Sequence, residues 1–480
     1  MNAHSSDPKR WKALALLGIA YLMVVLDVSI VNVALPSIEE DLGFSTEGLQ
    51  WVVSGYALTF GGFLLLGGRA GDLLGRRRIF MAGLLLFSLF SLLCGLAWSA
   101  GVLVAARLLQ GAAGAILAPS VFSIVSVTFE EGAERNKALG TLGAIAGSGA
   151  AIGVLAGGVL TEYAGWEWIF FVNIPIGLAA LFLVPVYVRE SRAPELARHF
   201  DAAGAVTITA SLMLFVYALT EAPDVGWITA QTIGLLAASV VLSLAFIAIE
   251  LRSRSPLVRL GIFRRRTLTG ANAIGLILGA TVFGMFFLLS LYMQQVLGFS
   301  ALKTGVGYLA VALSAVAASG VAQALVTKAG VKPVLTAGMA LLAGGLAYFT
   351  QISVGGSYFG DLFIGFLLIG VGMGFAFVPI SIAALAGVED REAGLASGLI
   401  NTNQQVGGAL GLAILITVAT TRTDNLLEDG VARPEAFTQG FTLAFWVGAA
   451  FALVGLVATV VVLRREDLRA VGAEPVTEAV

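Results

Sequence analysis

Two charged residues, Asp27 and Arg107, lie inside stretches of sequence that are otherwise strongly apolar. A charge at the centre of a membrane helix costs about 2.5–3.5 kcal/mol on insertion scales, so each residue needs a partner or a wet cavity. Burial disfavours an ionised carboxylate, whereas a nearby arginine favours it. Closing or wetting such a site therefore loads or releases a proton, and proton exchange is the chemistry we expect. The alternative is a static ion pair that only fixes two helices.

The composition argues against most other chemistry. Of the 480 residues, 58% are hydrophobic and 12% are charged, against about 25% charged residues in soluble proteins. Cys94 is the single cysteine, and His4 and His199 lie outside the apolar stretches, so we expect no disulfide, no metal site and no Ser-His-Asp triad in the membrane. A net charge of -2 leaves no basic excess for nucleic acid. We expect a membrane protein without a cofactor that is not an enzyme.

Fourteen apolar runs are each long enough to cross about 30 Å of hydrocarbon as a helix. They lie at about 11–35, 49–67, 79–97, 101–127, 137–160, 167–188, 203–220, 230–249, 270–296, 304–327, 333–353, 361–385, 395–419 and 440–463. If the N-terminus is cytoplasmic, 24 of the 28 Lys and Arg residues fall in cytoplasmic segments and only three fall outside. Positive loops stay in the cytoplasm, so we predict an all-α membrane protein with both termini inside.

The two buried charges are expected at the same depth. Asp27 lies close to the outer end of the first predicted helix, and Arg107 lies close to the outer start of the fourth. At about 1.5 Å per residue, both side chains are roughly 9–12 Å below the outer surface.

A weak internal repeat divides the chain. A Gly-x4-Pro element at 114–119 recurs at 374–379, and a Gly-Gly pair at 157–158 recurs at 407–408. Such a repeat indicates two six-helix halves, although close helix packing also explains each glycine. The expected parts are an N-terminal half at 1–188, two inserted helices with cytoplasmic linkers at 189–269, a C-terminal half at 270–463 and a cytoplasmic tail at 464–480.

Polar amides and aromatic residues within the predicted spans are candidates for lining a substrate cavity. One water-lined face of the bundle explains them together. The alternatives are interhelical hydrogen bonds, worth about 0.6 kcal/mol each, for the amides and lipid contact for the phenylalanines. The candidates are Asn32, Gln110, Phe283, Phe287, Gln294, Gln295, Asn401, Asn403 and Gln404.

Four motifs resemble the fourteen-helix drug:proton antiporter family of the major facilitator superfamily, and the resemblance covers nearly the whole chain. Residues 26–36 are similar to the family's LDxTIVNVALP signature, and residues 68–78 resemble the superfamily's GxxxDxxGR[RK] loop. Residues 107–111 match an RxxQG element, and residues 166–177 (WEWIFFVNIPIG) look like the start of helix 6 in this branch. The resemblance implies a rocker-switch antiporter in which Asp27 takes the proton and Arg107 couples it to substrate release.

The loop between the second and third predicted helices is a candidate cytoplasmic gate. Its residues are Gly68, Asp72, Gly75, Arg76 and Arg77. Gly75 permits a tight turn, and Asp72 is able to sit against the positive N-terminal end of the helix that begins near residue 394. We expect the two arginines to reach acidic residues at 389, 390 or 392; alternatively, the arginine run only enforces topology.

The fifth predicted helix departs from the family pattern. The antiporter motif GxxxGPxxGG keeps its glycines here at Gly149, Gly153, Gly157 and Gly158, but Val154 replaces the proline. We therefore expect a proline kink to be absent or shifted.

We expect a multi-pass transporter of the bacterial inner (cell) membrane that exports amphipathic organic compounds or drugs in exchange for protons, and so confers antibiotic resistance. A proton that crosses a potential of 100 mV supplies about 2.3 kcal/mol. With one carboxylate in the spans, neutral lipophiles or monocations fit better than compact dications. The alternatives are a dedicated exporter of one endogenous metabolite or antibiotic, a proton symporter, and a non-transporting membrane sensor with a degenerate transporter fold.

Overall fold

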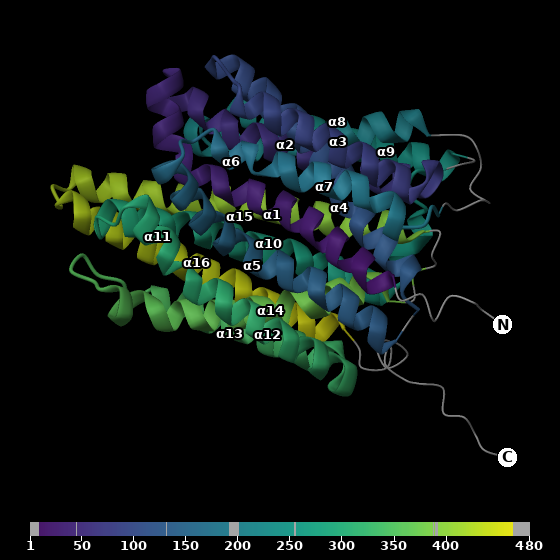
Figure 1. Cartoon of the computed structure of the whole chain (residues 1–480). Helices are drawn as coiled ribbons and strands as arrows, with labels where there is room; N and C mark the ends of the chain where they lie inside the picture. The colour runs from purple at the N-terminus through teal and green to yellow at the C-terminus, as the bar shows by residue number, and fades with distance from the viewer. Residues whose placement is uncertain are drawn as a thin grey trace.

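The computed structural model describes residues 9–44, 46–130, 132–191, 201–253, 256–386, 388 and 392–463, which form one bundle of long helices (Figure 1). The α-helices are α1 (Arg10–Leu42), α2 (Thr46–Leu74), α3 (Arg76–Gly95), α4 (Ala100–Thr128), α5 (Ala133–Tyr163), α6 (Trp168–Phe171), α7 (Asn173–Tyr187), α8 (Ala202–Val225), α9 (Ala230–Arg252), α10 (Arg266–Leu291), α11 (Ala301–Gly307), α12 (Leu309–Ala329), α13 (Val331–Phe349), α14 (Phe363–Leu385), α15 (Ala393–Glu428) and α16 (Arg433–Val462). A 3-10 turn, η1 (Leu260–Arg264), and two π-helical turns, η2 (Tyr292–Val296) and η3 (Tyr358–Leu362), complete the described elements.

Thirteen segments of the described chain are long and apolar enough to cross a membrane. The helix α5, with 31 residues, also runs through the bundle against α1, although its apolar stretch, Ile152–Tyr163, is shorter. The predicted all-helical membrane fold is confirmed.

Several helices are longer or less regular than predicted. The first extends to Leu42 and the α15 helix to Glu428, because apolarity reports only the part of a helix that lies in hydrocarbon. The sixth predicted span is divided into α6 and α7 at Val172. The α10 span ends in the π-helical turn η2, which contains both Gln294 and Gln295.

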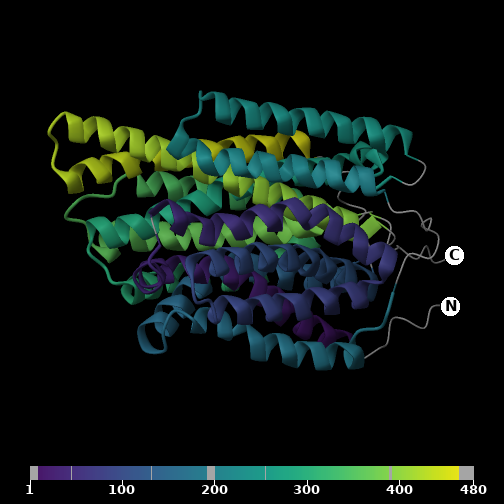
Figure 2. The ribbon, with the colours of Figure 1, turned by 90° about the horizontal axis from the view of Figure 1, so that it is seen from above.

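The helices form two groups with an additional pair beside them (Figures 1 and 2). The two groups contact each other chiefly through α2 against α15 and through α5 against α12 and α14. The pair α8 and α9 pack on each other, and α8 also contacts both α2 and α15. The start of α1 and the end of α16 lie at the same end of the bundle (Figure 1).

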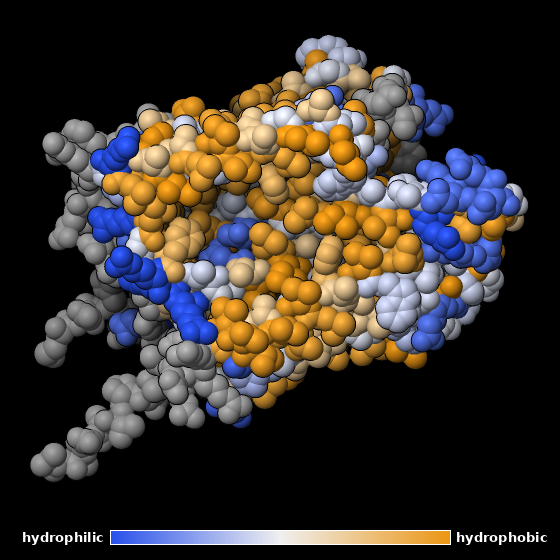
Figure 3. All heavy atoms as spheres, turned by 180° about the vertical axis from the view of Figure 1, so that it is seen from behind, coloured by the Kyte–Doolittle hydropathy of each residue, from blue (hydrophilic) through white to orange (hydrophobic). Residues whose placement is uncertain are grey.

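The surface carries a broad apolar belt (Figure 3). Hydrophobic residues dominate the middle of the face shown, and hydrophilic residues gather mostly toward its two ends. Many large hydrophobic side chains are exposed, and α9 presents Val240, Val241 and Leu244. Such a continuous apolar surface suits lipid as the surrounding solvent.

Candidate functional site

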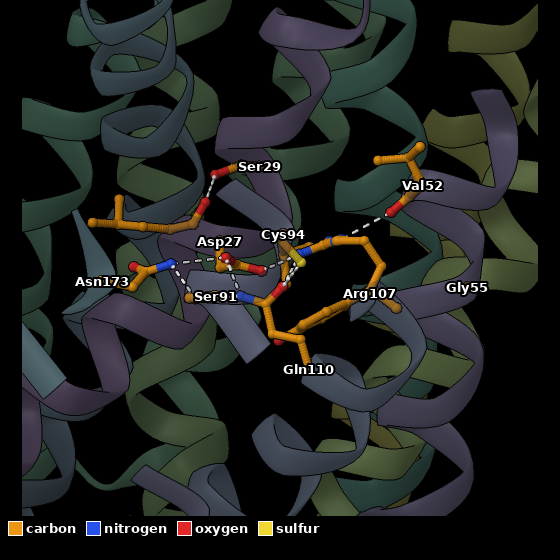
Figure 4. A network of polar contacts seen from close by, with 12 residues as sticks. Asp27, Ser29, Val52, Gly55, Ser91, Cys94, Arg107, Gln110 and Asn173 are labelled. Atoms are coloured by element: carbon orange, nitrogen blue, oxygen red, sulfur yellow. Dashed lines mark hydrogen bonds and ion pairs between the residues drawn. The ribbon is translucent and has the colours of Figure 1, made fainter. Parts of the chain in front are cut away.

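An enclosed ion pair joins α1 to α4 (Figure 4). Arg107 Nη1 lies 2.5 Å from Asp27 Oδ2, and the two side chains are 1% and 0% exposed. The contacts described for the pair come from α1, α2, α3, α4, α6 and α7, all in the first half of the chain. Asp27 and Arg107 therefore satisfy each other's charge where water does not reach.

Two amides complete the acceptor sites of Asp27. Gln110 Nε2 donates to Asp27 Oδ1 at 2.9 Å, and Asn173 Nδ2 donates to the same oxygen at 3.0 Å. Both amides also donate to the hydroxyl of Ser91 on α3, at 2.7 and 3.1 Å. Asp27 thus receives three donors, which is the arrangement that suits an ionised carboxylate, because that form only accepts hydrogen bonds.

Arg107 has partners besides the carboxylate. Its Nε donates to the backbone carbonyl of Val52 at 2.9 Å, and its Nη1 donates to Gln110 Oε1 at 2.7 Å. The guanidinium also lies 4.3 Å from the ring centroid of Tyr56, within the range of a cation–π contact. These contacts hold the guanidinium in place independently of Asp27.

The single cysteine belongs to the same network. Cys94 Sγ donates to Gln110 Oε1 at 3.4 Å, and its side chain is fully buried. The Tyr56 hydroxyl is also buried and has no hydrogen-bond partner.

Sequence reasoning pointed to Asp27, Arg107 and Gln110 but missed Ser91 and Asn173. A single neutral polar residue in an apolar span is too common to attract attention. Asn173 carried one signal, since it is a polar residue within the WEWIFFVNIPIG stretch.

The glycines of α5 bring α1 and α5 into close contact. A Cβ added at Gly157 would lie 2.6 Å from the carbonyl oxygen of Ile30, and one added at Gly153 would overlap the Ser29 hydroxyl. Gly149 likewise faces Val25. The α5 helix is continuous through Val154, which is buried. Gly158 is also buried. A Cβ at Gly153 would lie 3.0 Å from the carbonyl oxygen of Leu26, so α5 approaches the α1 backbone next to Asp27.

The loop between α2 and α3 joins the two groups of helices. Asp72 Oδ2 accepts a hydrogen bond from the amide of Leu395, in the first turn of α15, at 3.3 Å. Gly68 and Gly394 lie so close that a Cβ on either would overlap the other's carbonyl oxygen. A buried carboxylate at a helix N-terminus interacts favourably with the partial positive charge there. The contacts of Asp72 with Leu395 and of Gly68 with Gly394 therefore close the interface between α2 and α15 at this end.

The arginines of this loop bind within the first group of helices. Arg76 Nη2 lies 2.9 Å from Asp72 Oδ1, and Arg77 Nε lies 3.8 Å from Glu190 Oε2. Gly75 has a positive φ of 111°, as the tight turn requires. Of the acidic residues at 389, 390 and 392, the first two lie outside the described residues, and Glu392 pairs with Arg259 at 3.8 Å.

The candidate cavity residues do not form one set. Gln110 is buried in the Asp27 network, and Asn403 Nδ2 donates to Asn272 Oδ1 on α10 at 2.8 Å, which is an interhelical contact. Asn401 is buried and donates to the carbonyl of Ser397. Asn32 and Gln295 are exposed, and the partly exposed candidates are Phe283, Phe287, Gln294 and Gln404.

The comparisons with known proteins agree with this architecture. A sequence model of the Major Facilitator Superfamily matches residues 17–412. The crystal structure of the human organic anion transporter MFSD10 (TETRAN) matches the fold with a TM-score of 0.68 at 16% sequence identity, and covers 95% of this chain and 100% of that chain.

Several bacterial relatives are similar over most of their length. The puromycin resistance protein of Streptomyces alboniger is 40% identical over 95% of this chain and 91% of its own. The cephamycin export protein of Amycolatopsis lactamdurans is 39% identical over 86% of this chain and 85% of its own. The lincomycin resistance protein of Streptomyces lincolnensis is 34% identical over 85% of this chain and 84% of its own.

Proposed function

The chain belongs to the Major Facilitator Superfamily and is a drug or antibiotic efflux transporter, not an enzyme, and we propose that it exchanges its substrate for protons. The proposal rests chiefly on one observation. Asp27 is an enclosed carboxylate with three hydrogen-bond donors, and its charge is balanced by Arg107 on a different helix. A membrane site of this kind is functional by default.

The hydrogen-bond pattern supports a specific exchange step. Protonation of Asp27 removes the charge that attracts Arg107 and adds an O–H that needs an acceptor. Ser91 Oγ and Gln110 Oε1 belong to the same network, but each already accepts two hydrogen bonds, so one of these bonds must be released before the new O–H is accepted. Arg107 keeps the Val52 carbonyl and the Tyr56 ring as partners, so it does not become an isolated buried charge.

The packing of α1 offers a route from this step to the movement of the two halves, which we place at 1–188 and 270–463. The α1 helix carries Asp27 and packs on α5 through Gly153 and Gly157. The α5 helix in turn contacts α11, α12 and α14 of the other half. A shift of α1 upon protonation of Asp27 is therefore passed through α5 to the interface between the two halves.

We also propose the orientation. The connection between α2 and α3, next to Asp72 and the arginines at 76–78, lies at the same end of the bundle as the start of α1 and the end of α16 (Figure 1), and positive loops stay in the cytoplasm. Both termini are then cytoplasmic, and the contact between Asp72 and Leu395 is a closed cytoplasmic gate. In bacteria, the protein then lies in the cell membrane, with the closed gate facing the cytoplasm.

The substrate class follows from the relatives and from the charges. The names of the relatives refer to puromycin, cephamycin and lincomycin. Asp27 is enclosed with its own arginine, so no free carboxylate of the network is available for a dication. From the charges we propose neutral or monocationic amphipathic antibiotics, a class that includes the amines puromycin and lincomycin but not the carboxylate-bearing cephamycins. The names of the relatives favour a dedicated exporter of one antibiotic as the second candidate.

A proton-release measurement tests this function. Purified protein in weakly buffered detergent solution is mixed with puromycin or lincomycin, and the pH is followed. We expect proton release from the unaltered protein and none from Asp27→Asn, which keeps the shape of the side chain. Asp424→Asn, at an exposed position of α15, is the matched control and is expected to release protons normally.

The same variants in cells separate exchange from uptake. In a host without its own exporters, dissipation of the proton gradient should raise internal drug for an exporter and lower it for a symporter. Normal proton-driven efflux by an Asp27→Asn protein of normal abundance would contradict the proposed role of the ion pair.

A further inference from the structure

The segment between α9 and α10 lies across the cytoplasmic end of the interface between the halves. Residues 256–264, which we call the strap, include the turn η1 and lead directly into α10. Leu257, Val258 and Ile262 of the strap are 2%, 1% and 3% exposed. An ordinary connecting loop runs over the surface, whereas this one is inserted into the main hydrophobic core.

The strap is bound on both sides. Arg69 of α2 is buried and donates through Nη2 to the carbonyl of Pro256 at 3.3 Å. Arg259 of the strap lies 3.8 Å from Glu392, directly before α15. One anchor therefore belongs to the first half and the other to the second, at the level of the contact between Asp72 and Leu395.

Glu250, near the end of α9, provides a third anchor. Its Oε2 accepts a hydrogen bond from the amide of Val258 at 3.1 Å, and the residue is 5% exposed. Its Oε1 has no hydrogen-bond partner and lies over the first turn of α8, where a Cβ at Gly204 would approach it to 2.6 Å. A buried carboxylate with a free oxygen is costly, so its retention calls for a reason beyond packing.

Electrostatics and packing connect Glu250 to the gate. Arg69 lies within electrostatic range of Glu250, Asp72 and Glu392 and of the cation Arg259, and Asp201 also lies near Glu250. The inserted pair contacts both halves, since Gly62 of α2 lies against Met213 of α8 and Trp227, between α8 and α9, donates to the Thr417 hydroxyl of α15 at 2.8 Å. If the halves separate at this end while the pair stays on α2, the strap stays joined to α10, so its bonds to Arg69 and Glu250 break.

We propose that Glu250 is a positioning residue for transport, which holds the strap across the cytoplasmic entrance and so sets how readily that entrance opens. Glu250 acts through Val258 and does not touch the substrate. The inserted helices are then part of the gating apparatus. This inference rests on the proposed alternating exchange, but its test does not require proton coupling.

A distance measurement between the two halves tests the proposal. Ala133 at the start of α5 and Ala329 at the end of α12 are exposed, and both lie at the end of the bundle that carries the strap. We would replace both with Cys in a Cys94→Ser background, attach spin labels, and measure the distance distribution in lipid nanodiscs. The Cys94→Ser protein is used only if it exports drug as the unaltered protein does.

We expect the loss of Glu250 to increase the fraction of molecules in which the cytoplasmic entrance is open. Glu250→Ala should raise the ratio of long to short distances about tenfold, which corresponds to the loss of one charge-assisted hydrogen bond. Glu250→Gln keeps an acceptor for Val258 and should give a smaller rise, and Arg259→Ala should act in the same direction. Arg252→Ala, at an exposed position on the same last turn, should leave the distribution unchanged.

Unchanged distances in Glu250→Ala and Arg259→Ala, in proteins that still export drug, would overturn the proposal. If Glu250→Ala does not fold, Glu250→Gln and Arg259→Ala decide by the same criterion. An opened entrance in protein that releases no protons on drug addition would instead contradict the proton exchange and leave the strap supported.

Discussion

The guanidinium of Arg107 on α4 is 2.5 Å from the carboxylate of Asp27 on α1, although 80 positions of sequence separate them. The contact lies among α1–α4, α6 and α7, and each partner has further hydrogen bonds that position it. The two residues differ in their other partners. Arg107 also contacts the Val52 carbonyl and the Tyr56 ring, whereas no second cation is described beside Asp27.

Geometry as well as charge should matter at Arg107. Arg107→Lys keeps the positive charge but loses the fork that reaches Asp27, Gln110 and the Val52 carbonyl together. We expect efflux to fall at least about tenfold, from the loss of one or more charge-assisted hydrogen bonds, with normal membrane abundance. Drug efflux from loaded cells measures this effect. Arg422→Lys, at an exposed position of α15, should transport normally, and equal efflux by both variants would refute the geometric requirement.

The single cysteine offers a built-in reporter of water access. Cys94 is 0% exposed and bonded to Gln110, so a maleimide should label it slowly in the resting protein. Labelling should accelerate when a transported drug is added at low pH, because the network then opens. Labelling is followed by mass spectrometry, with a cysteine placed at the exposed Gly101 as the fully accessible reference. A rate that never changes during turnover would argue for a static ion pair.

The close approach of α1 and α5 should not tolerate a methyl group. Gly157→Ala places a Cβ near the Ile30 carbonyl, so the helices must separate. Overpacking of this kind costs about 1–3 kcal/mol, and we expect a lower melting temperature together with reduced efflux. Gly101→Ala, where nothing lies within 4 Å, should melt like the unaltered protein in the same thermal scan.

Asp72 should control access from the cytoplasm. Asp72→Asn removes the charge that binds Arg76 and the start of α15. A cysteine introduced at Ser397, which is buried between the halves, should then react several-fold faster with a hydrophilic maleimide in a Cys94→Ser background. Asp429→Asn, an exposed change at the opposite end of α15, should not alter that rate.

Two amides of the second half should behave differently when truncated. Gln295 is exposed on the π-helical turn η2, so Gln295→Ala should change the KM for drug with little loss of stability. Asn403 bonds to Asn272 across two helices, so Asn403→Ala should lower the melting temperature. Transport kinetics and thermal scans on both variants check this assignment, and identical effects would remove the distinction.

Much of the fold was predictable because apolar length alone identifies membrane helices. The extension of α15 to Glu428 and the break before Asn173 were not, since neither depends on apolarity. Asp27 and Arg107 stood out as lone charges, and regular helix rise placed them at one depth. The contact between Asp72 and the first turn of α15 followed from the attraction of a carboxylate to a helix N-terminus.

Other parts of the site depend on helix rotation and on chain segments without periodicity. Ser91 and Asn173 are neutral, and only packing turns them toward Asp27. Glu250 and Arg69 lie near the C-terminal ends of α9 and α2, where charged residues normally mark topology. Their burial arises because the strap folds back over them, and no spacing rule predicts that return.

All side chains described around Asp27 come from α1–α4 and α7, whereas the exposed Gln295 belongs to the other half. Under the proposed function, the proton site around Asp27 and the candidate drug contact at Gln295 thus belong to separate stretches of the chain. Substitutions in the second stretch would then alter which antibiotic is bound and leave the proton site unchanged. A bacterium that acquires such substitutions would keep a functional proton site while its transporter recognises a new drug.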